Sequence, residues 1–250
     1  MDLGIDGRVA LVMGASKGIG NGIAEALARE GARVAIASRS AERAAAAAAA
    51  IPGEVIGFDA DTGDLEGLAT LPGQVTTALG PVEILVTNTG GPPLGDALGA
   101  DLAAWREAYD HLVLAPRVLI EATLGAMRER GWGRVVNVGS SSTEEPIPGL
   151  ALSNAHRRAT VGFLKTLARE VAGDGVTVND VATGRFATDR LADNWGGREQ
   201  MERHAIEGIP AGRLGQPAEY GALVAFLCSE RAAYVTGTSI PIDGGLLRSI

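Results

Sequence analysis

Apolar and polar residues follow two rhythms along this chain: short, nearly continuous apolar runs, and longer stretches with apolar residues at helical spacing. Several of the short runs lack the period-two alternation of half-exposed strands, which is typical of strands covered on both faces in a parallel sheet. They predict strands over residues 9–13, 33–37, 54–58, 82–86, 134–138, 176–181 and 238–242. The longer stretches predict helices near 18–30, 40–50, 63–79, 101–130, 153–172 and 217–229.

The alternation of strand and helix along the chain predicts right-handed crossovers and a doubly wound α/β sheet. We therefore expect a single-domain, Rossmann-like fold over residues 1–250, with about seven parallel strands and helices on both faces. The stretch 183–216 interrupts the alternation with Gly184, Gly196, Gly197 and Pro210 among polar residues. A long irregular excursion of this kind is typical of a lid over a site, so we expect a substrate lid at 183–216.

The predicted helix over 101–130 contains an apolar run, from Leu112 to Ile120, that covers much of its circumference. Such a run predicts burial on more than one side of the helix. Pro116 lies within it, and we expect a bend there because an interior proline removes a backbone hydrogen bond.

Composition narrows the class of protein. The chain has 250 residues, of which 46% are hydrophobic, enough for one sizeable core. The net charge of −8 argues against nucleic acid or an anionic membrane as partner. The single Cys228 excludes an internal disulfide and fits a reducing compartment. Neither a secretory signal pattern nor an apolar stretch of about 18 residues is evident, so we expect a cytoplasmic protein without a membrane span.

A glycine-rich segment, Gly14-Ala-Ser-Lys-Gly18-Ile-Gly20, connects the first predicted strand to the first predicted helix. Glycines let the backbone turn tightly and approach a pyrophosphate, whose charge is favoured at the N-terminus of the next helix. The position of the segment between a strand and a helix predicts a nucleotide-binding site.

The spacing of these glycines, G-x-x-x-G-x-G, resembles the short-chain dehydrogenase/reductase family. Asp61-Thr62, Thr87-Asn88-Thr89-Gly90, Ser140, and Thr183-Gly184 to Thr188 extend the resemblance, and residues 212–245 are similar to the tail of 3-oxoacyl-carrier-protein reductases. The resemblance implies a nicotinamide dinucleotide and a small-molecule substrate. It places cofactor contacts at Gly14, Ser16, Lys17, Gly18, Ile19, Gly20, Ser38, Arg39, Asp61, Thr62, Asn88, Gly90, Gly184, Phe186 and Thr188, and it implies no metal ligand.

The end of the second predicted strand indicates which nicotinamide is used. In NAD-binding proteins an acidic side chain here holds the ribose 2′-hydroxyl, whereas this chain has Ser38-Arg39-Ser40. A guanidinium binds a 2′-phosphate bidentately, and Lys17 adds a second positive charge. We therefore expect NADP(H); the alternative is that Arg39 is a solvated loop residue.

The family's catalytic Tyr-x-x-x-Lys motif falls on Ser153-x-x-x-Arg157 when the segment Gly162–Leu167 fixes the register. Ser140 matches the family's catalytic serine, and the position of its catalytic asparagine falls on Leu112. Serine is far too weak an acid to replace the phenol that protonates the substrate oxygen. Arg157 stays charged and cannot pass a proton, but it can contact ribose hydroxyls or stabilise an oxyanion. The candidate catalytic residues are therefore Ser140, Ser153 and Arg157.

Other interpretations of these residues remain open. Ser153 or Asn154 would make a good N-cap, and Arg157-Arg158 could form a solvated helix face. We expect His156 at solvent or at an interface. His111 and Tyr109 are less favoured sources of a replacement acid. Glu144 and Glu145 could favour a cationic substrate, although an acidic surface pair is the commoner explanation.

Two functions follow as expectations. The first is an NADP(H)-dependent oxidoreductase with atypical catalytic machinery that acts on a carbonyl or hydroxyl group of a small molecule, such as an activated ketone; Arg157 argues against a protonated imine. The second is a non-catalytic NADP(H)-binding sensor or scaffold of the same fold. Relatives pair the helices at 101–130 and 153–172 across a two-fold axis, so the resemblance also implies a symmetric homo-oligomer, a dimer or tetramer.

Overall fold

The computed structural model describes residues 1–194 and 196–249, and it contains a seven-stranded sheet with only parallel pairings. The strands are β1 (Val9–Met13), β2 (Arg33–Ser38), β3 (Val55–Asp59), β4 (Ile84–Thr87), β5 (Gly133–Val138), β6 (Val176–Thr183) and β7 (Ser239–Ile242). Their order is β3-β2-β1-β4-β5-β6-β7. The predicted doubly wound sheet is confirmed, and its order reverses between β1 and β4.

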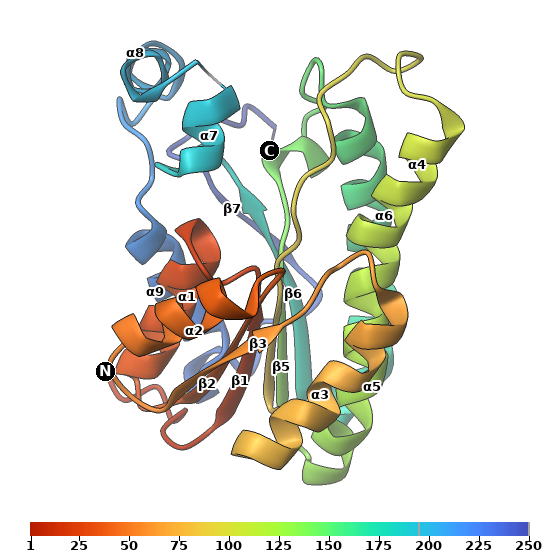
Figure 1. Ribbon diagram of the computed structural model, residues 1–250, viewed down its shortest axis with the longest axis vertical. Helices are drawn as coiled ribbons and strands as arrows, with labels where there is room; N and C mark the ends of the chain where they lie inside the picture. The colour runs from red at the N-terminus through yellow and green to blue at the C-terminus, as the bar shows by residue number, and fades with distance from the viewer. Residues whose placement is uncertain (195, 250) are drawn as a thin grey trace.

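Helices cover both faces of the sheet (Figure 1). On one face lie α1 (Gly18–Arg29), α2 (Ala41–Ala50) and α9 (Pro217–Leu227); on the other lie α3 (Leu65–Leu79), α4 (Leu102–Tyr109), α5 (Ala115–Arg130) and α6 (Ala151–Val171). Short 3-10 turns span Ser141–Thr143, Ala172–Asp174 and Glu230–Ala232. No helix within the described ranges has the length and apolar character needed to cross a membrane.

The sheet separates two apolar cores because successive strand residues point to opposite faces. Val12 of β1 packs in the same cluster as Ile23 of α1 and Val224 of α9. Leu11, one position earlier, belongs to the cluster that contains Leu119 of α5 and residues of α3 and α6. Full burial of each such side chain contributes about 1.5–3 kcal/mol to the free energy of folding. The packing of both helical layers on the sheet therefore fixes the strands whose ends form the site.

The helix predicted over 101–130 is interrupted. A π-helical turn at Asp110–Leu114 separates α4 from α5, and Pro116 lies in the first turn of α5. The missing N–H of Pro116 leaves the carbonyl of Leu112 without its usual helical donor. The hydroxyl of Thr160 on α6 donates to that carbonyl instead, at 2.7 Å. The predicted bend at Pro116 stays a prediction. The structure has a π-helical turn just before the proline, and a side chain from the neighbouring helix supplies the donor for the carbonyl of Leu112.

The stretch 183–216 is less irregular than predicted. It contains α7 (Asp189–Asn194) and α8 (Arg198–Gly208), which lie beyond the carboxyl ends of the strands, at the top of Figure 1. Met201 and Ala205 of α8 pack with Ala192 of α7 in a small apolar cluster of their own. That local packing explains why two short helices form here; the assignment of the stretch as a lid stays a prediction.

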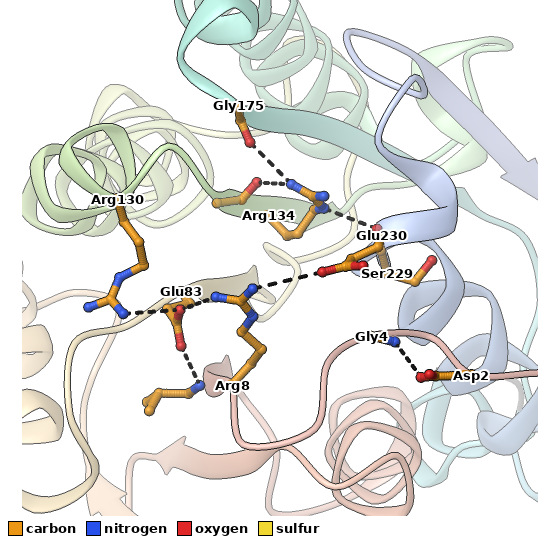
Figure 2. Close-up of polar contacts among 11 residues, drawn as sticks. Asp2, Gly4, Arg8, Glu83, Arg130, Arg134, Gly175, Ser229 and Glu230 are labelled. Atoms are coloured by element: carbon orange, nitrogen blue, oxygen red, sulfur yellow. Dashed lines mark hydrogen bonds and ion pairs between the residues drawn. The ribbon is translucent and has the colours of Figure 1, made fainter.

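A cluster of charged residues lies at the amino ends of the central strands (Figure 2). Glu83 is 6% exposed, and its carboxylate accepts a hydrogen bond from Arg8 at 2.6 Å. Arg130 lies 3.5 Å from the same oxygen, and the backbone N–H of Val9 donates to the other oxygen. These contacts tie β1, β4 and α5 together at the end of the sheet opposite the glycine segment.

Arg134 of β5 is 2% exposed in the same cluster. Its guanidinium donates to the carbonyl oxygens of Gly133, Gly175 and Ser229. The ring of Trp132 contacts two guanidiniums, with its centroid 4.3 Å from Cζ of Arg134 and 4.0 Å from Cζ of Arg8. Every arginine of this cluster therefore has partners within the chain.

Candidate active site

A cavity of about 550 Å³ opens at the carboxyl ends of the strands, next to the reversal between β1 and β4. Ligands of open α/β sheets bind in this place. Most of the predicted site residues line it: Gly14, Ser16, Lys17, Gly18, Ile19, Gly20, Ser38, Arg39, Thr62, Asn88, Gly90, Arg157 and Thr188. The structure thus brings together segments from the whole length of the chain around one cavity.

The glycine segment turns in a way that only glycine permits. Gly14 and Gly18 have φ angles of 59° and 61°, in the left-handed region. A Cβ on Gly20 would lie 2.9 Å from the carbonyl carbon of Gly14 and 2.8 Å from Nδ2 of Asn88. That amide also donates to the carbonyl of Gly14 at 3.3 Å. The turn is thereby fixed against β4 and opens onto the cavity.

The N-terminus of α1 lies within this turn, because the helix begins at Gly18. Lys17 is the N-cap residue, no side chain caps the helix, and its first turn holds no acidic residue. An uncapped helix N-terminus is suited to a diphosphate. Lys17 itself lies 3.6 Å from Asp189 of α7, so its charge is shared with the 183–216 stretch rather than directed only to a 2′-phosphate.

Two arginines lie at the cavity end near β2. Arg39 is exposed and lines the cavity, and so does Arg43, one helical turn later in α2. Neither guanidinium forms a hydrogen bond or ion pair with a residue that the structure describes. Ser38 lines the same end, and its hydroxyl donates to the carbonyl of Ser40 at 2.9 Å. Sequence reasoning missed Arg43, although a second arginine four residues after Arg39, in the first turn of a predicted helix, was a usable signal.

Arg157 enters the cavity from α6. Its Nη1 donates to the carbonyl oxygen of Val138 at the end of β5, at 2.9 Å. Burial, and after it the charge of Arg190, lower the pKa of the guanidinium to about 10, and the carboxylate of Asp180 opposes both effects. The group remains positive at neutral pH. The neighbouring Arg158 is exposed and binds the carbonyl of Thr143, so the pair does not form one solvated face.

Asp180 of β6 does not line the cavity, but its charge favours the protonated form of Arg157. Its side chain is 2% exposed and accepts hydrogen bonds from Asn137 Nδ2 at 2.7 Å and Ser239 Oγ at 2.8 Å. Desolvation raises the pKa of the carboxyl, and the hydrogen bonds and Arg157 oppose that rise. A carboxylate flanked by Asn179 and Val181 in an apolar strand was visible in the sequence, but nothing there showed that it approaches Arg157.

Two predicted catalytic residues do not line the cavity. Ser153 is 6% exposed and lies in the first turn of α6, one turn before Arg157. Leu150 is the N-cap residue of α6, so the prediction that Ser153 or Asn154 caps the helix is wrong. Ser140 is the N-cap residue of the short 3-10 turn Ser141–Thr143, and its Oγ accepts a hydrogen bond from the N–H of Ser142 at 3.1 Å. Ser153 is therefore a packed helix residue in this structure, and Ser140 has a structural role as the cap of a turn.

Among the described residues, no tyrosine lies in the cavity where it could protonate a substrate. The chain has three tyrosines, and among the described residues none of them lines the cavity. Tyr109 packs beside His156, and Tyr234 is fully exposed. Tyr220 is fully buried, bonded to Thr183 at 2.9 Å, and burial raises its pKa. A phenol with a raised pKa is a poorer acid than a free one.

The histidines next to these elements have other partners. His111 lines the cavity, but its Nδ1 lies 2.8 Å from the hydroxyl of Thr62, and Glu107 lies 3.8 Å from its Nε2. His156 is 7% exposed and packs against Trp105 with ring centroids 5.1 Å apart. The expectation that His156 faces solvent or an interface is wrong, because α4 covers it within the same chain.

The remaining predicted contacts lie outside the cavity lining. Asp61 accepts from the N–H of Gly63, and Gly184 packs so closely on Asp243 that a Cβ there would lie 2.5 Å from its Cα. Phe186 is 4% exposed and packs on Tyr220. Glu145 accepts from the N–H groups of Arg248 and Ser249. Glu144 lies 3.8 Å from Arg158 and likewise does not line the cavity.

Known proteins and a family model match nearly the whole length of this chain. A family model described as enoyl-(acyl carrier protein) reductase matches residues 14–247. The 3-oxoacyl-[acyl-carrier-protein] reductase of Haemophilus influenzae is 34% identical over 248 residues, 98% of this chain and 100% of the relative. Nodulation protein G of Azospirillum brasilense is 35% identical over 198 residues, 77% of this chain and 79% of the relative. L-sorbose reductase of Gluconobacter frateurii, solved with NADPH and L-sorbose, has a TM-score of 0.94 at 30% identity, with 100% of both chains covered.

These matches, together with the glycine turn and the sheet order, identify the class of protein. The chain belongs to the short-chain dehydrogenase/reductase family. The predicted family and its Rossmann-like fold are thereby confirmed.

Proposed function

We propose that this protein is an NADP(H)-dependent oxidoreductase that transfers hydride between the nicotinamide and the carbonyl carbon of a small molecule, without a phenolic proton donor. The membership of an oxidoreductase family supports the reaction type, and the arginines near β2 support the phosphorylated cofactor. The observation that carries the unusual part is Arg157, which lines the cavity on α6 while Ser153, one turn earlier, does not.

The cavity residues fit a dinucleotide with a 2′-phosphate. The glycine turn and the uncapped N-terminus of α1 suit the diphosphate, and Arg39 and Arg43 present two guanidiniums at the far end. When bound, the cofactor supplies or accepts the hydride. The protein contributes binding, orientation and charge.

Arg157 is the group that would stabilise the reacting oxygen. Negative charge builds on a carbonyl oxygen as hydride reaches its carbon, and a fixed cation nearby lowers that barrier. The bond from Nη1 to Val138 fixes the guanidinium and leaves other N–H groups to donate into the cavity. With a pKa of about 10, Arg157 keeps its protons at neutral pH, so the oxyanion takes its proton from water.

The test is NADPH oxidation over a panel of carbonyl compounds, followed by the absorbance of the reduced nicotinamide. Wild type should reduce ordinary ketones and 3-oxoacyl thioesters slowly. Ser153→Tyr combined with Arg157→Lys should raise the rate by a factor on the order of 10²–10⁴, because general acid catalysis contributes that much. Ser153→Tyr alone should gain less. Leu112→Asn is added to the double variant as a third change, to restore a water-binding amide.

Ser153→Ala is the matched control, and it should leave the wild-type rate unchanged because the serine hydroxyl does not line the cavity. A large loss in Ser153→Ala would show that the hydroxyl takes part. Tight NADPH binding with no turnover in wild type or in the double variant would support the sensor or scaffold instead.

We also propose a symmetric homo-oligomer, and the only support for it is the resemblance to the family. The apolar run over 112–120 is no argument for it, since the chain's own α3 and α6 bury most of that run. Light scattering gives the mass directly, and a monomer would contradict the assignment.

A further inference from the structure

Arg190 places an unpaired positive charge in the cavity. It lies at the start of α7, lines the cavity, and forms no hydrogen bond or ion pair with any residue in the described part of the chain. The side chain is exposed, yet desolvation by its surroundings lowers the pKa of the guanidinium. A partly desolvated charge without a partner is unfavourable, so this position favours a ligand that supplies an anion.

Gly91 provides the space for this guanidinium. A Cβ at Gly91 would lie 2.7 Å from Cζ and 2.9 Å from Nη1 of Arg190. Gly91 does not have a left-handed φ, so glycine is required for space rather than for backbone conformation. The loop after β4 and the start of α7 therefore hold the charge of Arg190 inside the cavity.

Arg157 is the second cation at this end. Both guanidiniums line the same cavity, and burial, with the charge of Arg190 as the next largest cause, lowers the pKa of Arg157 to about 10. The carboxylate of Asp180 does not line the cavity, and its oxygens accept hydrogen bonds from Asn137 and Ser239. It therefore does not neutralise the positive charge that Arg157 presents to the cavity.

The carboxylates that do line the cavity are engaged elsewhere. Asp189 lies 3.6 Å from Lys17 and 3.1 Å from Arg198, and Glu107 lies 3.8 Å from His111. Within residues 1–194 and 196–249, no carboxylate forms an ion pair with Arg157 or Arg190. A cationic substrate is therefore disfavoured at this end.

We propose that the substrate is an oxo acid, whose carboxylate binds Arg190 while its reacting carbonyl oxygen faces Arg157. This inference rests on the proposed oxidoreductase function. A guanidinium binds a carboxylate bidentately, which fixes the orientation of the carbonyl as well as adding affinity. Pro92, Pro93, Leu112 and Val138 form an apolar wall for the hydrocarbon part of such a molecule.

The test compares an oxo acid with its methyl ester, which lacks the negative charge. Wild type, assayed with NADPH, should give a kcat/KM about tenfold or more higher for 2-oxo-4-phenylbutanoate than for its methyl ester. Arg190→Gln should abolish this acid-over-ester ratio. Gly91→Ala should also reduce it, because the added methyl displaces the guanidinium without removing its charge. Arg203→Gln, which changes an exposed arginine of α8 paired with Glu199, should leave the ratio unchanged.

Two further measurements separate this inference from its rivals. If Arg190→Gln weakens NADPH binding while the acid-over-ester ratio stays as in wild type, Arg190 binds the cofactor's diphosphate and the proposal is overturned. Equal kcat/KM for acid and ester in wild type also overturns it. Titration calorimetry of the NADP⁺-loaded protein with the same acid needs no turnover. Acid binding that Arg190→Gln abolishes, without any turnover, would support the anion site and refute the oxidoreductase function.

Discussion

Arginines gather at both ends of the sheet, and the two groups differ in what neutralises them. At the amino ends, Arg8 and Arg130 face the buried Glu83, and Arg134 donates to three backbone carbonyls (Figure 2). At the carboxyl ends, Arg157 has one carbonyl partner, and Arg190 has none among the described residues.

This difference distinguishes arginines that stabilise the fold from arginines that are available to a ligand. A buried ion pair or a guanidinium bonded to carbonyls is satisfied by the fold and depends on it, so its removal is expected to affect stability. A charge held in a cavity without a partner gains nothing from folding, and we propose that its partner is a ligand. The amino-end cluster joins strands and helices, and we propose that the carboxyl-end arginines bind cofactor and substrate.

The largest effect on stability is expected at Glu83. Glu83→Gln should lower the free energy of unfolding by about 3 kcal/mol, the lower end of the range for breaking a buried pair, because Arg8 is partly exposed. Urea unfolding measures the change. Glu25→Gln, which removes an exposed partner of Arg29, is the control and should change it by less than about 0.5 kcal/mol. Equal losses in the two variants would remove the structural role assigned to the amino-end cluster.

Arg39 should show the opposite behaviour. Arg39→Ala should raise the Kd for NADPH about tenfold or more, the effect of losing one charge-assisted contact, and leave the Kd for NADH and the unfolding free energy unchanged. Calorimetric titration with both cofactors measures this. Arg29→Ala on α1 serves as the control, since its side chain pairs with Glu25 and lies outside the cavity lining. Identical Kd values for NADPH and NADH in wild type would contradict the choice of cofactor.

A smaller, pH-dependent effect is expected at Asp180. Desolvation raises the pKa of its carboxyl in the folded protein, so the folded state holds the proton more tightly than the unfolded state. Stability from this group therefore falls as pH rises from the ordinary aspartate pKa, about 4, through the raised pKa. Wild type should gain stability relative to Asp180→Asn as pH is lowered from neutral toward about 4. Thermal unfolding across that range checks the sign, and a pH-independent difference would show that the carboxyl titrates normally.

Much of the fold could be predicted from the sequence because it depends on local patterns. The apolar run of β1 matches its observed bounds, Val9–Met13, since both faces of that strand are covered. The glycine turn was predictable for a similar reason: its backbone geometry excludes other residues. The helices α7 and α8 were not predicted, because they pack mainly on each other in a stretch whose glycines indicated irregular structure.

The site was harder to predict because its charges depend on tertiary neighbours. The sequence placed Lys17 and Arg157 at the cavity, but it could not show that Lys17 lies near Asp189 or that Asp180 approaches Arg157. Arg190 was missed for the same reason, since an arginine two residues after Thr188 resembles any exposed residue until Gly91 is seen beside it. His156 was predicted to lie at solvent or at an interface, and the aromatic side chains of α4 that bury it are about 50 positions away in sequence.

The most direct test of the contrast between the two ends is a paired measurement of urea unfolding and carbonyl-dependent NADPH oxidation on Arg134→Met and Arg157→Met. Arg134→Met should lose about 2–3 kcal/mol of unfolding free energy, because three carbonyls lose a charged donor, and should keep its kcat/KM while folded. Arg157→Met should stay within about 1 kcal/mol of wild type, because methionine fills similar volume without a desolvated charge, and should lose at least about tenfold in kcat/KM. If Arg157→Met loses as much stability as Arg134→Met and retains wild-type turnover, the account is contradicted.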